Sequence, residues 1–187
     1  MHARADSIFS LSNHEICILT ARDGERFSGQ IATWILPATL VPDHQRVLAV
    51  LSPANHTEAL IRASGRFVVN LLASDQYDLV PLFGLVSSRD IDKFDGMSLQ
   101  YSRNGLPLIP DTCGWAECIT VATLDGGDRM VYLADVVEQY VNPAKTPLRK
   151  IEAYAKQSPD ILALLEEKNR KDGERDRASM KLFDHGK

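Results

Sequence analysis

The residues best suited to chemistry in this sequence lie at positions 51–57, where an apolar run ends and a helix is expected to begin. The first turn of a helix presents free backbone N–H groups and the positive end of the helix dipole, which together favour an anion. Ser52 and Thr57 add hydroxyl donors there, and His56 is the one histidine that we single out, because it stands at this junction. The junction could hold a phosphate, although an ordinary capped helix has the same geometry and is the commoner case.

A second polar segment, residues 87–94, combines two cations with two hydroxyl groups. Arg89 and Lys93 could meet a phosphate there, because charged donors make strong hydrogen bonds to phosphate oxygens. A surface turn with local ion pairs explains the same residues, and on these residues alone it is the simpler interpretation.

Other chemistries lack their sequence signatures. The chain has no Gly-x-Ser-x-Gly motif, which argues against a hydrolase with a nucleophile elbow. The three cysteines, Cys17, Cys113 and Cys118, form no Cys-x-x-Cys pair, so we expect no metal site and no disulfide framework, and each should be a small core residue. Trp34 and Trp115 are also expected in the core.

Composition sets the class of protein that must position these residues. With 187 residues, of which 44% are hydrophobic and 25% charged, the chain is typical of one globular domain. Its net charge of -4 argues against a general binder of nucleic acid or of anionic membranes. No apolar stretch approaches the ~20 residues of a membrane span, and no apolar signal core follows Met1, so we expect a cytoplasmic protein.

The strands are expected to form a largely antiparallel sheet of about six members. Two Asp-Gly pairs each separate runs rich in β-branched and apolar residues, which is a strong hairpin signal. These hairpins join residues 15–21 to 27–34 and residues 117–124 to 130–137. The almost continuously apolar runs 47–51 and 67–72 predict two more strands, buried on both faces or lining a barrel.

Four helices are expected between and after these strands. Asn55 and Glu58 suggest a capping-box start for a helix that Gly65 ends, and a second helix is predicted over residues 74–83 despite Pro81. Near the end of the chain, Thr146-Pro147 and Ser158-Pro159 are favoured openings for two more helices. The charged run 166–177 is interpreted as a solvated helix end or tail.

Taken in order, these segments resemble the flavin reductase-like family of FMN-binding split barrels, over roughly residues 8–140. Each motif is weak alone, but their order and spacing together are specific. The motifs that carry the resemblance are residues 20–34 (TARDGERFSGQIATW), 51–57 (LSPANHT), 65–72 (GRFVVNLL), 89–94 (RDIDKF), 105–108 (GLPL), Glu117-Cys118 and 125–128 (DGGD).

The resemblance implies a mainly β protein with helices, a Greek-key, antiparallel split β-barrel with C-terminal helices. Residues 1–145 would form the flavin-binding domain, and residues 146–187 a helical extension and charged tail that could widen a dimer contact or cover the cofactor. It further implies a homodimer with the flavin in a groove between subunits. The implied cofactor-binding residues are Gln30, Ile31, Ala32, Thr33 and Trp34 for the ring, Ser52, Pro53, Ala54, Asn55, His56 and Thr57 for the ribityl chain and phosphate, and Arg89 and Lys93 as phosphate-side cations.

The activity that the resemblance implies is hydride transfer from NADH or NADPH to FMN, with FAD as the alternative flavin, and onward to free flavin, oxygen, a partner oxygenase or an electron-transfer protein. The flavin carries such chemistry, which fits the lack of an evident acid–base pair. Two rivals remain: an FMN electron carrier reduced by a protein donor without nicotinamide activity, and a relative of this fold that has lost FMN and serves as a binding module.

Three positions depart from the family pattern. Ile31 and Thr33 stand where Thr and Ser are common, which removes one hydroxyl beside the ring. Arg129 follows Asp128 where many members have histidine; it cannot act as an acid or base near neutrality, but it could hold an anionic flavin or a nucleotide phosphate. An exposed hairpin residue is the alternative role for Arg129.

Overall fold

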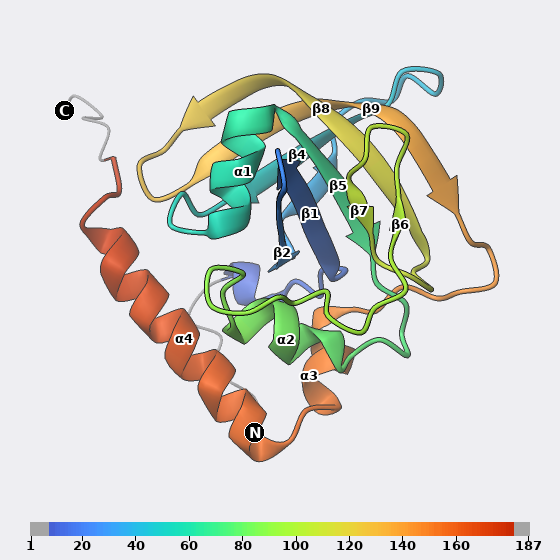
Figure 1. The fold of residues 1–187 in the computed structure, drawn as a ribbon. Helices are drawn as coiled ribbons and strands as arrows, with labels where there is room; N and C mark the ends of the chain where they lie inside the picture. Colours follow the sequence, from blue (N-terminus) through green and yellow to red (C-terminus); the bar gives the residue numbers. More distant parts are fainter. Residues whose placement is uncertain (1–7, 182–187) are drawn as a thin grey trace.

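A computed structural model of the chain describes residues 8–181, in which helices pack against a seven-stranded antiparallel sheet (Figure 1). The residues before Ile8, on which the expectation of a cytoplasmic protein rests, and the last six of the predicted tail lie outside the described part. The strands are β1 (Cys17–Asp23), β2 (Arg26–Ala32), β3 (Ile35–Pro37), β4 (Arg46–Leu51), β5 (Arg66–Leu71), β6 (Gln100–Tyr101), β7 (Pro107–Leu108), β8 (Gly114–Asp125) and β9 (Met130–Val141). The helices are the short 3₁₀ helix η1 (Ile8–Leu11) and the α-helices α1 (His56–Ser64), α2 (Leu79–Leu85), α3 (Lys150–Ala155) and α4 (Pro159–Arg177).

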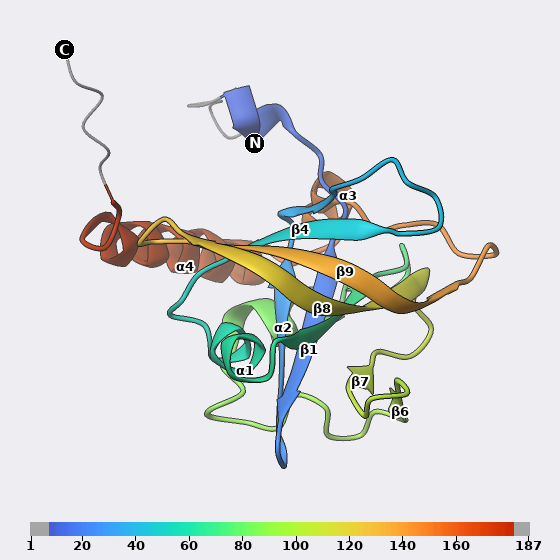
Figure 2. The ribbon, with the colours of Figure 1, turned by 90° about the horizontal axis from the view of Figure 1, so that it is seen from above.

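The sheet is curled into a split barrel. Its strand order is β2-β1-β5-β8-β9-β4-β3, so the two edge strands, β2 and β3, are neighbours in the sequence. In a flat sheet of this size the edges would lie roughly 29 Å apart. Only Thr33 and Trp34 connect them, and that linker spans at most about 11 Å. The edges must therefore approach each other, and Figure 2 shows the curled sheet from above.

Both predicted hairpins are present. Asp23 pairs with Arg26 across the first turn, where Gly24 adopts a φ of 60° that favours glycine. The second hairpin is longer than predicted: β8 and β9 have 12 residues each and pair with two irregularities in register. The runs 47–51 and 67–72 form β4 and β5 as expected, whereas β3, β6 and β7 were not predicted.

Helix α1 begins after Asn55 and ends before Gly65 as predicted, but its start is not a capping box. The side chain of Asn55 makes no capping hydrogen bond. The carboxylate of Glu58 is fully buried and accepts a hydrogen bond from the hydroxyl of Tyr132 on β9 at 2.6 Å. Glu58 therefore bonds to Tyr132 across the barrel instead of to the backbone at the start of its own helix, as a capping box would require.

Two other helix boundaries differ from prediction. Helix α2 begins at Leu79 rather than at residue 74, which puts Pro81 in the first turn. Backbone N–H groups in the first turn have no partner within the helix, so the N–H that proline lacks is not needed there. Thr146-Pro147 opens no helix, because residues 146–148 are extended: Pro147 bridges Ala73, and α3 begins only at Lys150. The start of α4 is as predicted, with Ser158 accepting a hydrogen bond from the N–H of Ile161.

The core has two main parts. One fills the barrel and includes Phe67 and Cys118, and the other lies beneath the helices and includes Phe83 and Leu165 of α4. All three cysteines are free and buried, as expected, and burial raises the pKa of Cys17 and Cys118 to about 12. The prediction that Trp34 is a core residue is wrong, since it is 48% exposed. Among residues 8–181, no helix has both the length and the apolar character that crossing a membrane requires.

Candidate functional site

A cavity of about 540 Å³ opens between β2, the junction of β4 with α1, helix α2 and helix α4. Its size is typical of a site for a small ligand. The walls are formed by residues that lie far apart in the sequence. They include residues 28–34, 50–52, 54–57 and 83–89, together with Lys93, Arg129, Lys150 and part of α4.

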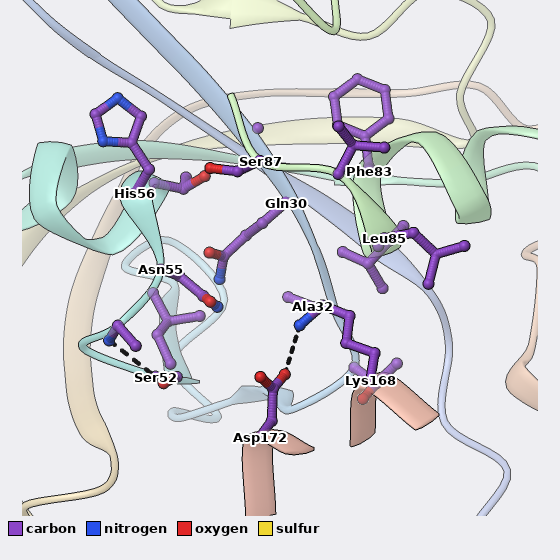
Figure 3. Close-up of a pocket in the computed structure, with 18 of the residues that line it drawn as sticks. Gln30, Ala32, Ser52, Asn55, His56, Phe83, Leu85, Ser87, Lys168 and Asp172 are labelled. Carbon is purple, nitrogen blue, oxygen red and sulfur yellow. Dashed lines mark hydrogen bonds and ion pairs between the residues drawn. The ribbon is translucent and has the colours of Figure 1, made fainter. Parts of the chain in front are cut away.

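The first wall is β2 and the two residues that follow it, which include the predicted ring-binding segment 30–34. Because β2 is an edge strand, its outer backbone groups have no partner in the ladder, and apart from those of Gly29, which bond to Lys93 and Ser88, they are available to a ligand. Figure 3 shows the amide of Gln30 pointing into the pocket, toward Asn55. Gln30 is only 8% exposed, and its Oε1 atom has no hydrogen-bond partner in the protein. An unpaired buried acceptor costs about 1–3 kcal/mol, so a donor on a ligand would relieve it.

The second wall is the β4–α1 junction. Ser52, Ala54, Asn55, His56 and Thr57 line the pocket, as the sequence suggested, whereas Pro53 is not among its lining residues. The side chain of Asn55, the residue at the cap position, accepts no hydrogen bond from the N–H groups of the first turn of α1. They are therefore left for a ligand or solvent, and the helix dipole favours an anion there.

Neighbouring groups fix the position of one side chain of the junction, Thr57, and lower the pKa of another, His56. The hydroxyl of Thr57 is buried and lies 2.7 Å from the hydroxyl of Ser28, which ties α1 to β2. The pKa of His56 is lowered from its usual value, first by burial and then by the charges of Arg89, Arg26 and Lys93. Burial and the positive surroundings therefore both disfavour the protonated imidazole.

The two predicted phosphate-side cations differ in their surroundings. Arg89 is exposed, and its Nη1 lies 3.4 Å from the carbonyl oxygen of Ala54 at the junction. Lys93 is buried, and its ammonium donates to the carbonyl oxygens of Gly29 at 2.9 Å and Phe83 at 3.3 Å. Burial lowers the pKa of Lys93 to about 8. Arg89 is thus accessible to a ligand, whereas Lys93 already holds β2 against α2.

The third wall is α4, part of the extension that the resemblance allowed to cover the cofactor, although no residue of this helix was singled out from the sequence. Lys168, Asn169, Asp172 and Arg175 line the pocket, and Figure 3 shows Lys168 and Asp172 projecting into it and paired with each other. Their separation by four and three residues places Lys168, Asp172 and Arg175 on one face of a helix, which is the one signal that could have singled them out.

Arg129 joins α4 to the hairpin of β8 and β9. Its guanidinium lies 2.5 Å from a carboxylate oxygen of Asp176 and over the ring of Trp34, 5.4 Å from the centroid. Burial acts to raise the pKa of Asp176, but hydrogen bonds from Arg129 and Arg175 outweigh it and lower that pKa. With its side chain only 26% exposed and paired in this way, Arg129 is not the free hairpin residue that one alternative envisaged.

The charge of the pocket is opposite to that of the chain. The chain carries a net charge of -4, yet the pocket lining contains six cationic side chains and one carboxylate, that of Asp172. Such a lining favours an anion over a cation. Across residues 8–181, no group of histidine, cysteine and acidic side chains is placed to hold a metal ion. The cations are Arg89, Lys93, Arg129, Lys150, Lys168 and Arg175.

Comparison with known sequences points to flavoproteins. The family model described as the flavin reductase like domain matches residues 9–156. High molecular weight rubredoxin of Moorella thermoacetica is 32% identical over 126 residues, covering 66% of this chain and 54% of that protein. A flavin reductase of Pseudomonas putida is 28% identical over 135 residues, covering 71% of this chain and 76% of that protein. The chain spans about half of the first of these curated relatives, and about a fifth of two diflavin flavoproteins that it also matches.

Comparison with solved structures supports the same fold. The FMN-binding protein from Thermus thermophilus superposes with a TM-score of 0.68 at 19% identity, covering 77% of this chain and 79% of that one. Nitrilotriacetate monooxygenase component B from Mycobacterium thermoresistibile superposes with a TM-score of 0.67 at 26% identity, covering 79% and 84%. The antiparallel split barrel with C-terminal helices, predicted from the sequence, is confirmed.

Proposed function

The chain belongs to the flavin reductase-like family, and from this membership we propose that it is an oxidoreductase that transfers hydride from NADH or NADPH to FMN. The observation that carries the proposal is the cation-lined pocket along the free edge of β2, with the unpaired amide oxygen of Gln30 inside it. A flavin mononucleotide has both features that this pocket requires: a ring with hydrogen-bond donors and an anionic phosphate.

The residues present fit FMN at both ends. Along β2, the backbone of residues 30–34 and the amide of Gln30 would hold the ring, with Ile31, Ala32, Thr33 and Trp34 acting through their main chain. At the start of α1, the uncapped N–H groups would hold the phosphate with Ser52, Asn55, His56, Thr57 and Arg89. FAD would need room for a further nucleotide, so FMN is the simpler occupant.

The bound flavin supplies the hydride-accepting group, and the protein's own residues bind, orient and shield it. Phe83 and Leu85 provide the apolar part of the lining that excludes water. As an arginine, Arg129 contributes positive charge to the pocket and not a group for proton transfer. The two hydrogen bonds from Lys93 fix the positions of Gly29 and Phe83, and so keep β2 in a fixed position relative to α2.

The electrons would pass to free flavin, oxygen, a partner oxygenase or an electron-transfer protein. A component of a monooxygenase is among the structural neighbours, which supports an oxygenase as partner. We further propose that the chain works as a homodimer. The segment that follows β2 begins with Trp34 in the pocket lining and exposes apolar side chains, which a second copy would cover; they are Trp34, Leu36, Leu40 and Val41.

A second candidate is an FMN electron carrier that takes electrons only from a protein donor. The observation that favours it is the ion pair of Arg129 with Asp176, which anchors α4 beside the position where many family members have a histidine. A nicotinamide nucleotide would have to fit alongside this helix.

An anaerobic absorbance titration separates these candidates. We expect purified protein to shift the visible bands of added FMN and to bleach them on addition of NADH or NADPH. Bound flavin that stays oxidised with both nucleotides would identify the electron carrier. No spectral shift with FMN would refute flavin binding and with it the proposed function.

A further inference from the structure

We infer that Arg175 of α4 binds the phosphate of the flavin and makes the pocket selective for phosphorylated flavin over riboflavin. The inference rests on the proposed function and adds to it a residue beyond position 156, where the family match ends. Four features of the structure lead to it: the anchoring of α4, the face that it presents, the reach of Arg175, and the engagement of Lys93.

Helix α4 is anchored on both sides of the pocket. Toward its start, Leu165 is buried in the core beneath α2. Past its end, the N–H of Lys181 donates to the carbonyl oxygen of Gly126 at 3.0 Å, and its ammonium lies 2.6 Å from a carboxylate oxygen of Asp125. Figures 1 and 2 both show the helix passing α2 and ending beside the hairpin of β8 and β9. The residues between these anchors are therefore held against the pocket.

The face that α4 turns toward the pocket carries a net positive charge. Lys168 and Arg175 are its cations, and Asp172, between them in the sequence, lies 2.5 Å from Lys168 Nζ and 2.9 Å from Arg175 Nη1. The neighbouring cation Arg170 is not part of this face: it pairs with Glu167 and with Glu174 along the outer side of the helix and does not line the pocket.

Arg175 reaches the phosphate end of the pocket. Its Nη2 lies 3.4 Å from the hydroxyl oxygen of Ser52, at the junction that leads into the uncapped start of α1. A hydrogen bond of this length is weak, so a phosphate oxygen can replace it with a stronger one. Asp176 accepts from Nε and Nη2 of the same guanidinium, at 2.9 and 2.7 Å. The aspartates fix its orientation, which lowers the entropic cost of binding a ligand.

The phosphate needs this cation because Lys93 is otherwise engaged. The ammonium of Lys93 already donates to two main-chain carbonyl oxygens, whereas Arg89, the other cation that the family pattern suggested, is exposed and makes one long hydrogen bond, to Ala54. Arg89 from the loop after α2 and Arg175 from α4 would then hold the phosphate from different elements, since both contact the β4–α1 junction, at Ala54 and at Ser52.

Calorimetric titration of the full chain with FMN and with riboflavin tests the inference. Replacing Arg175→Gln should weaken FMN binding by about tenfold, the effect of one charge-assisted hydrogen bond, and should leave riboflavin binding unchanged. Arg170→Gln removes the same charge from the outer side of α4 and should leave both affinities as they are. Arg175→Lys restores the charge and should recover part of the preference for FMN.

The outcomes are distinct. If Arg175→Gln weakens FMN and riboflavin equally, α4 is a structural wall and the inference is wrong. If the variant changes neither affinity, Arg175 lies outside the site and the inference is again wrong, while the proposed function stands. If the unaltered protein binds neither flavin, the proposed function fails and this inference fails with it.

Discussion

The carboxylate of Glu58 lies fully inside the barrel, and Tyr132 provides its hydrogen bond. The second carboxylate oxygen has no hydrogen-bond partner, although Arg62 Nη2 lies 3.4 Å away. Tyr132→Phe would leave this buried carboxyl group without its hydrogen-bond donor, and we expect a loss of about 1–3 kcal/mol in the free energy of unfolding. Urea denaturation measures it. Tyr140→Phe, at an exposed position of β9, should change stability by less than about 0.5 kcal/mol, and equal effects of the two variants would contradict the prediction.

The imidazole of His56 should report an anion at the start of α1. Its pKa is lowered first by burial and then by three nearby cations, and a bound phosphate would offset those charges. We therefore expect FMN or inorganic phosphate to raise the pKa of His56 toward 6.5. Because the complex then binds a proton more tightly than the free protein, FMN affinity should increase as the pH falls through this range.

NMR titration of the imidazole, assigned by comparison with His56→Asn, measures the shift. Riboflavin is the matched ligand without phosphate, and it should leave the pKa nearly unchanged. A pKa of His56 that stays the same in saturating FMN would place the phosphate elsewhere.

At the residue level, the sequence could indicate the junction of residues 52–57 because its members are contiguous. Their proximity to β2 followed only from the family resemblance. The partners of Lys93 could not be foreseen, since Gly29 and Phe83 are brought to it by the packing of α2 on the barrel. Asp176 was equally hidden, because its link to Arg129 spans 47 positions of the chain.

At the level of elements, Gly127 decides how closely the end of α4 approaches the hairpin of β8 and β9. Its φ of 87° favours glycine, and an added Cβ would overlap the carbonyl oxygen of Ser179. We expect Gly127→Ala to displace the end of α4 and to speed tryptic cleavage after Arg175 and Arg177. Limited proteolysis with mass spectrometry follows these cuts.

Gly24→Ala is the control for this experiment. Gly24 also has a positive φ, of 60°, but an added Cβ would meet nothing within 4 Å. That variant carries backbone strain of about 1–2 kcal/mol without a clash. If both variants are cleaved at the same rate in α4, the glycine at 127 does not control the docking of the helix.

The elements that the sequence predicted are those with strong local signals. Asp-Gly turns indicated both hairpins, and Ser158-Pro159 indicated the start of α4. Strands of two or three residues, such as β3 and β7, have no periodicity to detect and exist because neighbouring chain pairs with them. The same reason explains Thr146-Pro147, where pairing with residues 72–74 overrode a favourable helix opening.

For the whole molecule, the proposed homodimer predicts a molar mass in solution of twice that of one chain, which light scattering measures. Leu36 on the edge strand β3 is 53% exposed, two residues after Trp34 of the pocket lining, and Leu36→Glu should yield monomers and weaken flavin binding. The cost of placing a charge in an apolar contact drives the dissociation. Leu164→Glu makes the same change at an exposed position of α4 and should leave the mass unaltered. Dimers that persist in Leu36→Glu would assign the contact to another surface.

The position of Trp34 gives the molecule an optical reporter. The chain has two tryptophans. Trp34 lines the pocket beneath the guanidinium of Arg129, whereas Trp115 belongs to β8 and packs against Leu106 and Leu108. Flavins absorb light at the wavelengths that indole emits, so a flavin in the pocket should quench the fluorescence of Trp34 more strongly than that of Trp115. Occupancy could then be followed without a label during rapid mixing, and Trp34→Phe would remove most of the signal. Trp34, which we expected in the core, would then report the rates at which flavin enters and leaves the pocket.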